Sequence, residues 1–269
     1  KVGTRVCSVP ILPRQSGVTA IGYSSEVPGG YSEQMVLSEP MLLEVPNGLS
    51  SEMAALTEPM AVGCHAVEMA RLKGDELPLV IGCGPVGLAV IAALKLKGIG
   101  PIVASDYSSA RRQLAETMGA DIIVDPSKSS PYEKWSELAT HGVDGETLPP
   151  DFLTGMPGLR TGVYFECVGV PGIINQMMAG SKQGGRIVVV GVCMEEDTFT
   201  PMNGITGELN IQFALGYTPE EFTATLFKIA EGEILAEPMI TGTVDIDGVP
   251  KAFKDLADPE QHAKIIVKP

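Results

Sequence analysis

Several kinds of residue are scarce in this 269-residue sequence, and each scarcity narrows the class of protein. No apolar run reaches the ~18 residues that a membrane-spanning helix needs. Lys and Arg number 19 against 33 Asp and Glu, and the resulting net charge of −14 argues against nucleic acid or an anionic membrane as a partner. Aromatic residues make up only 5%, whereas hydrophobic residues make up 44% and 31 residues are glycine. This balance is typical of an α/β enzyme.

Cysteine is also scarce, and its spacing excludes a disulfide framework. The five cysteines occur singly and never as C-x-x-C, at Cys7, Cys64, Cys83, Cys167 and Cys193. This pattern predicts reduced thiols in a cytoplasmic protein and no structural zinc site. No signal peptide is present, and the chain begins abruptly at Lys1 without methionine. We therefore expect further sequence upstream.

The most informative segment is a short apolar strand that runs into a glycine-rich turn at 82–87, of sequence GCGPVG. Gly82 permits a tight turn, and Gly84 lets the backbone approach a pyrophosphate. Gly87 lets the following helix pack closely on the strand. A helix is predicted over 85–97, beginning at Pro85 and Val86, and the free N–H groups and positive dipole end of this helix face the phosphates. The segment therefore predicts dinucleotide binding.

Asp106 ends the second strand, nineteen residues after Gly87. A carboxylate here accepts hydrogen bonds from a ribose 2′-hydroxyl and repels a 2′-phosphate, which favours NAD over NADP. The alternative is that Asp106 only caps the helix predicted at 108–118. Arg111 lies one turn into that helix, where its guanidinium either stacks on adenine and reaches the ribose or is a solvated cation. The sequence leaves these two roles of Arg111 equally open.

Strands and helices alternate from Leu79 onward, which predicts a doubly wound parallel sheet of six strands. The predicted strands lie near 79–82, 102–106, 122–124, 163–168, 186–190 and 209–214, and the helices near 85–97, 108–118, 172–180 and 219–231. Residues 126–160 interrupt the alternation: a short helix is expected around Trp135, and 141–160 read as a long loop.

Short strands are predicted outside the sheet as well. They lie near 5–9, 31–37 and 41–45, before a turn at 46–48, and near 241–245 and 263–267, with a helix at 249–256 between the last two. Two helices, about 51–61 and 62–73, precede the sheet. The C-terminal strands are expected to rejoin the N-terminal β region rather than extend the sheet.

Ligands of open α/β sheets bind beyond the carboxyl ends of the strands. The fourth and fifth strands end at Cys167-Val168-Gly169 and Gly191-Val192. We expect both edges to approach the cofactor through their backbones. The cysteines are interpreted as packing thiols, because nothing in the sequence places a base beside them.

These motifs together resemble the zinc-dependent medium-chain dehydrogenase/reductase superfamily, on its alcohol, polyol and threonine dehydrogenase side. The resemblance covers nearly the whole chain and is weakest at 126–160. The motifs that carry it besides the glycine turn are VGTRV at 2–6, GGYSE at 29–33, LTEPMAVG at 56–63, ETMGAD at 116–121, FECVG at 165–169 and GGRIVVVG at 184–191.

The resemblance implies an NAD-binding Rossmann domain at 62–234 and a GroES-like catalytic domain, of which 1–61 and 235–269 are parts. It implies NAD-dependent hydride transfer between a secondary alcohol and a ketone, assisted by a catalytic zinc. In the family, zinc ligands are an early Cys, a His-Glu pair and a later acid or Cys. Only the last has a counterpart here, Glu58, which its apolar neighbours suggest is partly enclosed. One ligand cannot hold zinc, so we expect this chain alone to be inactive, with no confident catalytic residue.

Other interpretations remain open. A zinc-free quinone or enoyl reductase of the same superfamily would not need Glu58, and a non-catalytic NAD-binding module would fit the chain taken by itself. A methyltransferase is disfavoured by the six-strand pattern. His65 is more readily a structural histidine than a cofactor contact, and His141 and His262 are not expected to be catalytic. The resemblance further implies a homodimer or homotetramer acting on a small-molecule alcohol or ketone.

Overall fold

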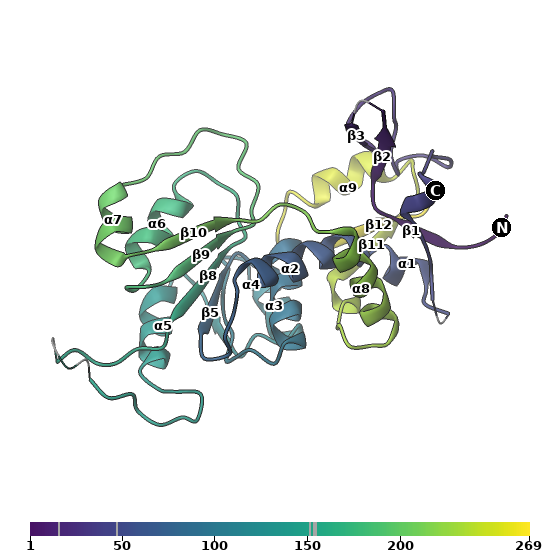
Figure 1. Ribbon diagram of the computed structural model, residues 1–269. Helices are drawn as coiled ribbons and strands as arrows, with labels where there is room; N and C mark the ends of the chain where they lie inside the picture. Colours follow the sequence, from purple (N-terminus) through teal and green to yellow (C-terminus); the bar gives the residue numbers. More distant parts are fainter. Residues whose placement is uncertain (16, 47, 151, 153–154) are drawn as a thin grey trace.

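A six-stranded parallel sheet forms the centre of the computed structural model, which describes residues 1–15, 17–46, 48–150, 152 and 155–269. The strand order is β10-β9-β8-β5-β6-β7 (Figure 1). The α/β doubly wound prediction is confirmed, and each predicted strand is present within two residues. The strands are β5 (Leu77–Ile81), β6 (Val103–Ser105), β7 (Ile122–Val124), β8 (Gly162–Glu166), β9 (Arg186–Val189) and β10 (Asn210–Phe213).

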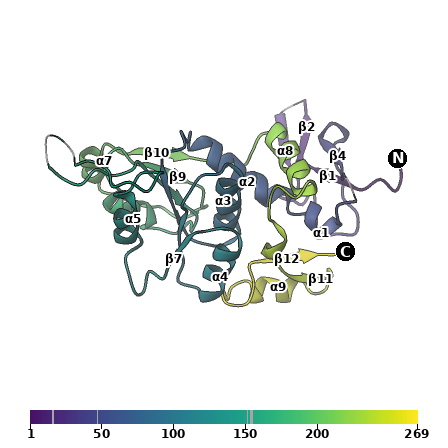
Figure 2. The ribbon, with the colours of Figure 1, turned by 90° about the horizontal axis from the view of Figure 1, so that it is seen from below.

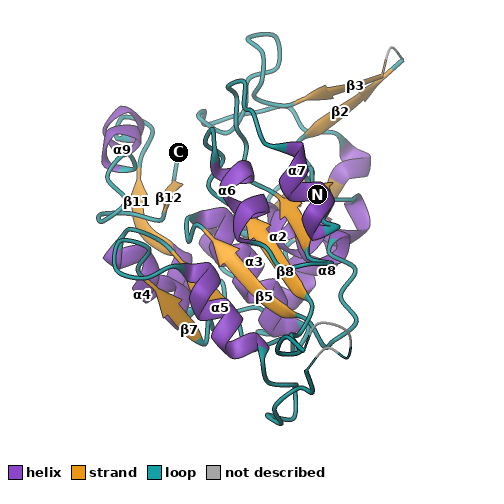
Figure 3. Cartoon of the chain, turned by 90° about the vertical axis from the view of Figure 1, so that its left-hand side faces the viewer, coloured by secondary structure: helices purple, strands orange, loops and turns teal. Residues whose placement is uncertain are grey.

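Helices cover both faces of this sheet, as the continuously apolar strands require (Figure 3). Every residue of β5 is buried: Val80 packs on one face, whereas Leu79 and Ile81 pack on the other. The first face carries α3 (Pro85–Leu96) and α4 (Ser109–Thr117), and the second carries α5 (Pro131–Ala139) and α6 (Ile173–Gly180). A further helix that the sequence analysis missed, α7 (Pro201–Gly207), contacts α6.

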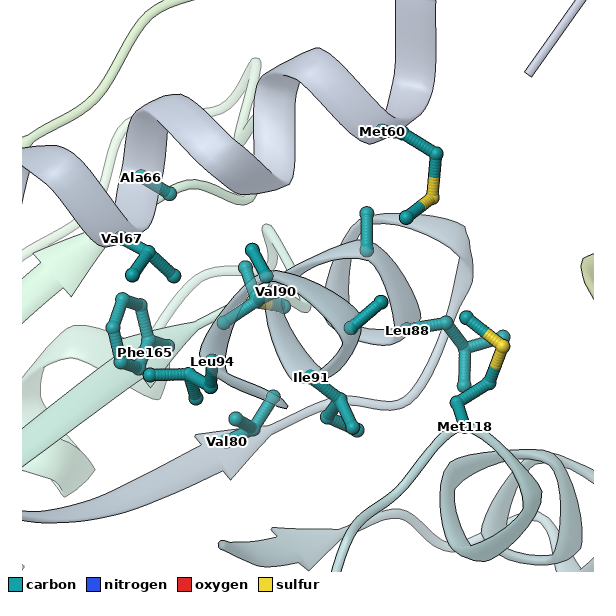
Figure 4. Packing of buried hydrophobic residues seen from close by; sticks show 14 of the residues in the cluster. Met60, Ala66, Val67, Val80, Leu88, Val90, Ile91, Leu94, Met118 and Phe165 are labelled. Atoms are coloured by element: carbon teal, nitrogen blue, oxygen red, sulfur yellow. The ribbon is translucent and has the colours of Figure 1, made fainter. Parts of the chain in front are cut away.

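The core of the first face lies between α3 and α2 (Thr57–Met69), the helix that precedes the sheet. Figure 4 shows Met60 and Val67 of α2 facing Leu88 and Val90 of α3, and each of these side chains is at most 1% exposed. Burying a side chain of this size contributes about 1.5–3 kcal/mol. The α2–α3 contact therefore fixes the position of the helix that follows the glycine-rich turn.

Gly63 permits the close contact between α2 and α3. A Cβ atom at this position would contact the backbone carbonyl carbon of Ala89, and it would lie 2.6 Å from the Ala89 carbonyl oxygen. We expect Gly63→Val to lower the free energy of unfolding by about 2 kcal/mol, because the helices must separate. Helix propensity alone would favour valine over glycine, by about 0.5 kcal/mol. Urea unfolding measures the difference.

Gly30→Val is the control for this substitution. A Cβ atom at Gly30 meets no atom within 4 Å, so its expected effect is within about 0.5 kcal/mol. Equal unfolding midpoints for the two variants would contradict the packing argument.

The core of the second face contains Trp135, the one tryptophan of the chain. Its indole Nε1 donates a 2.9 Å hydrogen bond to the Leu77 carbonyl oxygen, and its ring lies 5.3 Å from that of Tyr164. The short helix expected around Trp135 is confirmed as α5, which begins at the Ser130 N-cap. The region after α5 is a long loop in its described part, and the buried Arg160 side chain anchors the loop's end on the Asp75 carbonyl oxygen at 2.8 Å.

The rest of the chain lies beside this sheet and contains both termini (Figures 1 and 2). Three two-stranded sheets pair β1 with β4, β2 with β3 and β11 with β12. The C-terminal strands do not join the six-stranded sheet, as predicted, and Lys268 pairs with Glu52 of the N-terminal region. The elements are β1 (Val6–Ser8), β2 (Ile11–Arg14), β3 (Gly17–Ala20), β4 (Leu42–Glu44), α1 (Ser51–Ala54), α8 (Pro219–Ala230), β11 (Ile240–Val244), α9 (Val249–Asp255) and β12 (Lys264–Val267), with 3₁₀ turns at Glu39–Met41 and Glu237–Met239.

Two predictions in the N-terminal region are wrong. Residues 31–37 form no strand, because the Ser32 hydroxyl donates to the Gly29 and Gln34 carbonyl oxygens and turns the chain locally. The two helices break at 55–56 rather than at 61, because Pro59 lacks an N–H and fits only the first turn of α2. The β2–β3 pair has no counterpart among the predicted strands.

Residues 16, 47, 151, 153 and 154 lie outside the described residues. Residue 47 belongs to the turn predicted at 46–48, and the last three belong to the predicted loop at 141–160.

Among the helices that the structure describes, none is long and apolar enough to cross a membrane.

Candidate functional site

A cavity of about 550 Å³ lies beyond the carboxyl ends of β5, β6 and β8. After β5 the chain adds β6 and β7 on one side, and it then returns to add β8 on the other. The loops after β5 and β8 therefore diverge, and this is where open α/β sheets bind their ligands. The residues lining the cavity are Ile81, Gly82, Gly84, Ser105, Asp106, Tyr107, Ser108, Arg111, Pro126, Ser130, Pro131, Tyr132, Cys167, Val168, Val170, Pro171, Ile173, Gln176 and Pro259.

The glycine-rich turn has the geometry that its sequence predicts. Gly82 has a φ of +91°, which side chains rarely adopt, and a Cβ atom there would lie 2.7 Å from Val168 Cγ2. A Cβ atom at Gly87 would collide with the Gly82 carbonyl oxygen, so α3 packs directly on the turn. Gly84 differs, because a Cβ atom there would meet only the Arg111 guanidinium, at 3.8 Å from its Nη1. The space above Gly84 is thus left open toward the cavity.

The Asp106 carboxylate is fixed by two backbone N–H groups. Its Oδ2 accepts from Cys83 N at 2.7 Å, and its Oδ1 accepts from Ser108 N at 2.8 Å. Each oxygen retains a second lone pair for a ligand hydroxyl. Arg112 holds the same loop, because its Nη1 donates to the Asp106 carbonyl oxygen at 2.8 Å while its Nη2 pairs with Asp125 at 3.2 Å. The N-cap of α4 is Ser108 rather than Asp106, whose carboxylate fixes the turn before the helix and forms part of the cavity wall.

Arg111 lines the cavity and is not a fully solvated cation. Its Nε is buried and has no hydrogen-bond partner in the part of the chain that the structure describes. A buried N–H without an acceptor costs about 1–3 kcal/mol. The Nη1 of Arg111 adjoins Gly84 at the cavity, where an anionic or polar ligand would accept a hydrogen bond from the guanidinium.

Glu166 is a site residue that the sequence analysis quoted in a motif but did not interpret. Its side chain is only 1% exposed, and its Oε1 accepts hydrogen bonds from Val168 N at 2.7 Å and Gly169 N at 2.8 Å. This carboxylate shapes the loop that follows β8, which forms one wall of the cavity. An acid at the buried end of a strand, directly before a glycine turn, is the signal that would have identified it.

The predicted residues at the ends of β8 and β9 lie together. A Cβ atom at Gly169 would be 2.7 Å from the Val192 carbonyl oxygen, and one at Gly191 would be 2.5 Å from Gly169 N. Of the predicted set, Cys167 and Val168 line the cavity, whereas Gly169, Gly191 and Val192 do not. Pro85, Val86 and Gly87 likewise are not among the lining residues.

The thiols of Cys83, behind the glycine-rich turn's backbone, and of Cys167, which lines the cavity, are neutral. Burial, followed by the Asp106 charge, raises the pKa of Cys83, and burial, followed by the Glu166 charge, raises that of Cys167. Thiols with raised pKa values are poor nucleophiles. This agrees with their interpretation as packing residues.

Other lining residues were missed because they come from segments without a recognised motif. Pro126, Ser130 and Tyr132 come from the approach to α5, and Pro259 comes from the C-terminal turn between α9 and β12. Burial raises the pKa of Tyr132, so its phenol stays protonated. The Ser-Pro pair at 130–131 is a helix-start signal that could have placed this segment.

Glu58 lies away from this cavity, in the first turn of α2. The expectation that it is partly enclosed is wrong: Glu58 is exposed, because it lines a separate open cavity of about 360 Å³ beside Cys7 and Thr57. Burial, and then the Glu58 carboxylate, raise the pKa of the neighbouring Tyr217. Among the described residues, no three His, Cys, Asp or Glu side chains lie close enough together to hold a metal ion. The described residues therefore do not fit a zinc ion.

The histidines have structural contacts. His65 Nδ1 lies 2.8 Å from Glu221 Oε2, which connects α2 to α8 and agrees with the structural interpretation. His262 Nδ1 lies 3.1 Å from the Thr241 carbonyl oxygen, and His141 lies in the loop after α5. None of the three lines the cavity.

Comparison with known proteins agrees with this architecture. The sequence profile of the zinc-binding dehydrogenase family matches residues 85–231. The chain is 32% identical to (R,R)-butanediol dehydrogenase of Bacillus subtilis (strain 168), covering 100% of this chain and 75% of that protein. The crystal structure of 2R,3R-butanediol dehydrogenase from Bacillus subtilis superposes with a TM-score of 0.82, again over 100% of this chain and 75% of that chain.

Two further relatives are more distant. The (R,R)-butanediol dehydrogenase of Saccharomyces cerevisiae is 29% identical, and 96% of this chain covers 64% of it. L-arabinitol 4-dehydrogenase of Aureobasidium melanogenum is 27% identical, and 98% of this chain covers 71% of it. The fold, the profile match and these identities lead to one conclusion: this chain belongs to the zinc-binding dehydrogenase family of medium-chain oxidoreductases.

Proposed function

We propose that this chain binds NAD(H) and provides the cofactor site for hydride transfer between a secondary alcohol and a ketone. The observation that carries the proposal is the cavity in which Gly84, Asp106 and Arg111 converge beyond the carboxyl edge of the sheet. The cavity combines space for a close backbone approach, a carboxylate with free lone pairs and an arginine guanidinium beside the glycine turn. These features match a pyrophosphate and an adenosine ribose.

Each residue has a proposed role in holding the dinucleotide. Gly82, Gly84 and Gly87 form the turn. Pro85 begins α3 without an N–H, and the N–H groups of Val86 and Gly87 face the pyrophosphate. Asp106 accepts from the ribose hydroxyls, and Arg111 donates to the pyrophosphate. The backbone at Cys167–Val168–Gly169 and Gly191–Val192 approaches the nicotinamide end. When bound, the nicotinamide supplies the hydride chemistry.

The proposal does not extend to the chemistry of a catalytic zinc. We propose no step through zinc, because the described residues do not fit it, and Glu58 remains a candidate for a single ligand. The division into 1–61, 62–234 and 235–269 also remains a proposal. α2 crosses the first of these boundaries as a continuous helix.

Small alcohols or polyols are the proposed substrates. The relatives named above are dehydrogenases of butanediol and arabinitol, in which the reacting carbon is a secondary alcohol. We also propose a homodimer or homotetramer formed through the cofactor part. β10 is an edge strand of the sheet, and Phe213 and Leu215 at its end are 65% and 90% exposed.

Calorimetric titration with NADH tests the cofactor proposal. We expect saturable binding at one site per chain, and absence of binding would contradict the proposal. Oxidation of 2,3-butanediol by NAD⁺, followed by NADH absorbance, tests the substrate class separately. Turnover would support the substrate class. NADH binding without turnover would support the cofactor site and agree with the expectation that this chain alone is inactive, because its described residues do not fit zinc.

A further inference from the structure

The N-terminus of α4 adjoins Asp106 at the edge of the cavity, and its free N–H groups are all occupied by the chain itself. Ser108 N donates to Asp106 Oδ1 at 2.8 Å, and Arg111 N donates to Ser108 Oγ at 3.1 Å. The two N–H groups between them, of Ser109 and Ala110, donate to Glu260, at 2.9 Å to Oε1 and 3.1 Å to Oε2. An uncapped helix N-terminus binds anions. Here a side-chain carboxylate takes that position.

Glu260 reaches this position from the far end of the sequence, about 150 residues away. Its Oε2 also accepts from Ser109 Oγ at 2.7 Å, and Ser108 Oγ donates to the carbonyl oxygen of the preceding Pro259 at 3.1 Å. Asp258 Oδ1 accepts from Glu260 N at 3.0 Å and fixes the turn. Pro259 itself lines the cavity. The Glu260 carboxylate is therefore held beside the same cavity edge as Asp106.

We propose that Glu260 is a second determinant of cofactor specificity, which acts with Asp106 to exclude the 2′-phosphate of NADP(H). A phosphate on the 2′-oxygen would adjoin Asp106 and the N-terminus of α4. It would find no free N–H donor there, and it would meet two carboxylates of like charge. NAD(H) carries no charge at this position and is unaffected. This inference rests on the proposed NAD(H) function.

The cations near this edge do not offset the two carboxylates. Arg112 is neutralised by Asp125, at 3.2 Å, and donates to the Asp106 and Tyr107 carbonyl oxygens. Arg111 lies beside Gly84, where the pyrophosphate is proposed to bind. If Glu260 is removed, the N–H groups of α4 become free for a phosphate. Its loss thus removes a repulsion and exposes donors together.

The charge of Glu260 is constant over the working pH range. Hydrogen bonds from the Ser108 and Ser109 hydroxyls and from Ala110 N lower its pKa to about 2. The carboxylate is thus ionised from about pH 4 upward. Because the 2′-phosphate itself titrates at about pH 6, we expect the discrimination due to Glu260 to be the same at about pH 7.5 and about pH 9, within error.

The test compares the dissociation constants of NADH and NADPH for the wild type, Glu260→Gln and Glu260→Ala. We expect NADPH to bind about 10-fold more tightly to both variants, whereas the NADH constant changes less than twofold. Because the site is exposed, the gain should shrink as salt rises from about 0.05 to 0.5 M. Asp255→Asn is the matched control: it removes one carboxylate from the end of α9, where it pairs with Lys251, and should change neither constant.

The outcomes separate specificity from structure. Unchanged NADPH affinity in both Glu260 variants, with NADH binding intact, would overturn this inference and leave the proposed function standing. Equal weakening of NADH and NADPH binding would also overturn the inference. Loss of a purely structural contact between the C-terminal turn and α4 would have that effect. Failure of the wild type to bind NADH would instead overturn the proposed function on which the inference rests. Circular dichroism of each variant checks that the fold is retained.

Discussion

Gly84→Val is expected to abolish NADH binding while leaving the protein folded. Gly84 has a φ of −69° and a ψ of −176°, a conformation that valine adopts without strain. A Cβ atom there meets only the Arg111 guanidinium within 4 Å, so the added side chain occupies the cavity rather than the core. The pyrophosphate then cannot approach the turn. We expect the NADH affinity to fall by at least about 100-fold, or ~2.7 kcal/mol, as measured by calorimetric titration.

The unfolding free energy of Gly84→Val should stay within about 1 kcal/mol of the wild type, since no protein atom is displaced. Retained NADH affinity in a folded Gly84→Val variant would show that the cofactor does not bind against this turn. The cavity would then serve another ligand.

Gly87→Val, three residues further along the turn, should instead destabilise the fold. A Cβ atom at Gly87 would collide with the Gly82 carbonyl oxygen, and it would lie 2.9 Å from the Gly82 carbonyl carbon. Both contacts are backbone, and Gly82 is itself held at a φ of +91°, so neither side can yield without breaking the turn. We expect Gly87→Val to lower the free energy of unfolding by about 4 kcal/mol or more.

Thermal and urea unfolding measure this loss, and Gly84→Val is the matched control with the same added atoms. A pair of variants with equal stabilities would contradict the assignment of one glycine to ligand approach and the other to packing. We therefore expect Gly84→Val to lose NADH affinity without losing stability, and Gly87→Val to lose stability.

The sheet could be predicted from the sequence because its signals are local. Each strand is a short apolar run followed by a helix, and the glycine turn between β5 and α3 follows a recurring pattern. The strand predicted at 31–37 is wrong because a feature outside the strand pattern decides its conformation. The segment follows a Gly-Gly turn and suits a short strand, but the Ser32 hydrogen bonds to the Gly29 and Gln34 carbonyl oxygens turn the chain instead. A short local pattern cannot reveal whether a partner strand exists.

The candidate site was predictable only where its residues belong to that pattern. Gly84, Asp106 and Arg111 were identified because the turn and the second strand place them. Tyr132 and Pro259 approach the cavity from segments far away in the sequence, so only the tertiary fold brings them there. Glu58 was expected to be enclosed from its apolar neighbours, but those side chains pack inward and leave the carboxylate exposed.

The position of Trp135 makes the protein its own optical probe. The chain has one tryptophan, buried in α5, and the N-terminal end of that helix lines the cavity. Tryptophan fluorescence, excited selectively above the tyrosine absorption, therefore comes from a single emitter in the helix that reaches the cavity. Reduced nicotinamide absorbs where tryptophan emits, so occupancy of the cavity should quench Trp135 by energy transfer. A titration of the protein with NADH, followed by tryptophan fluorescence, would then report energy transfer from Trp135 to one bound nicotinamide, without an added label.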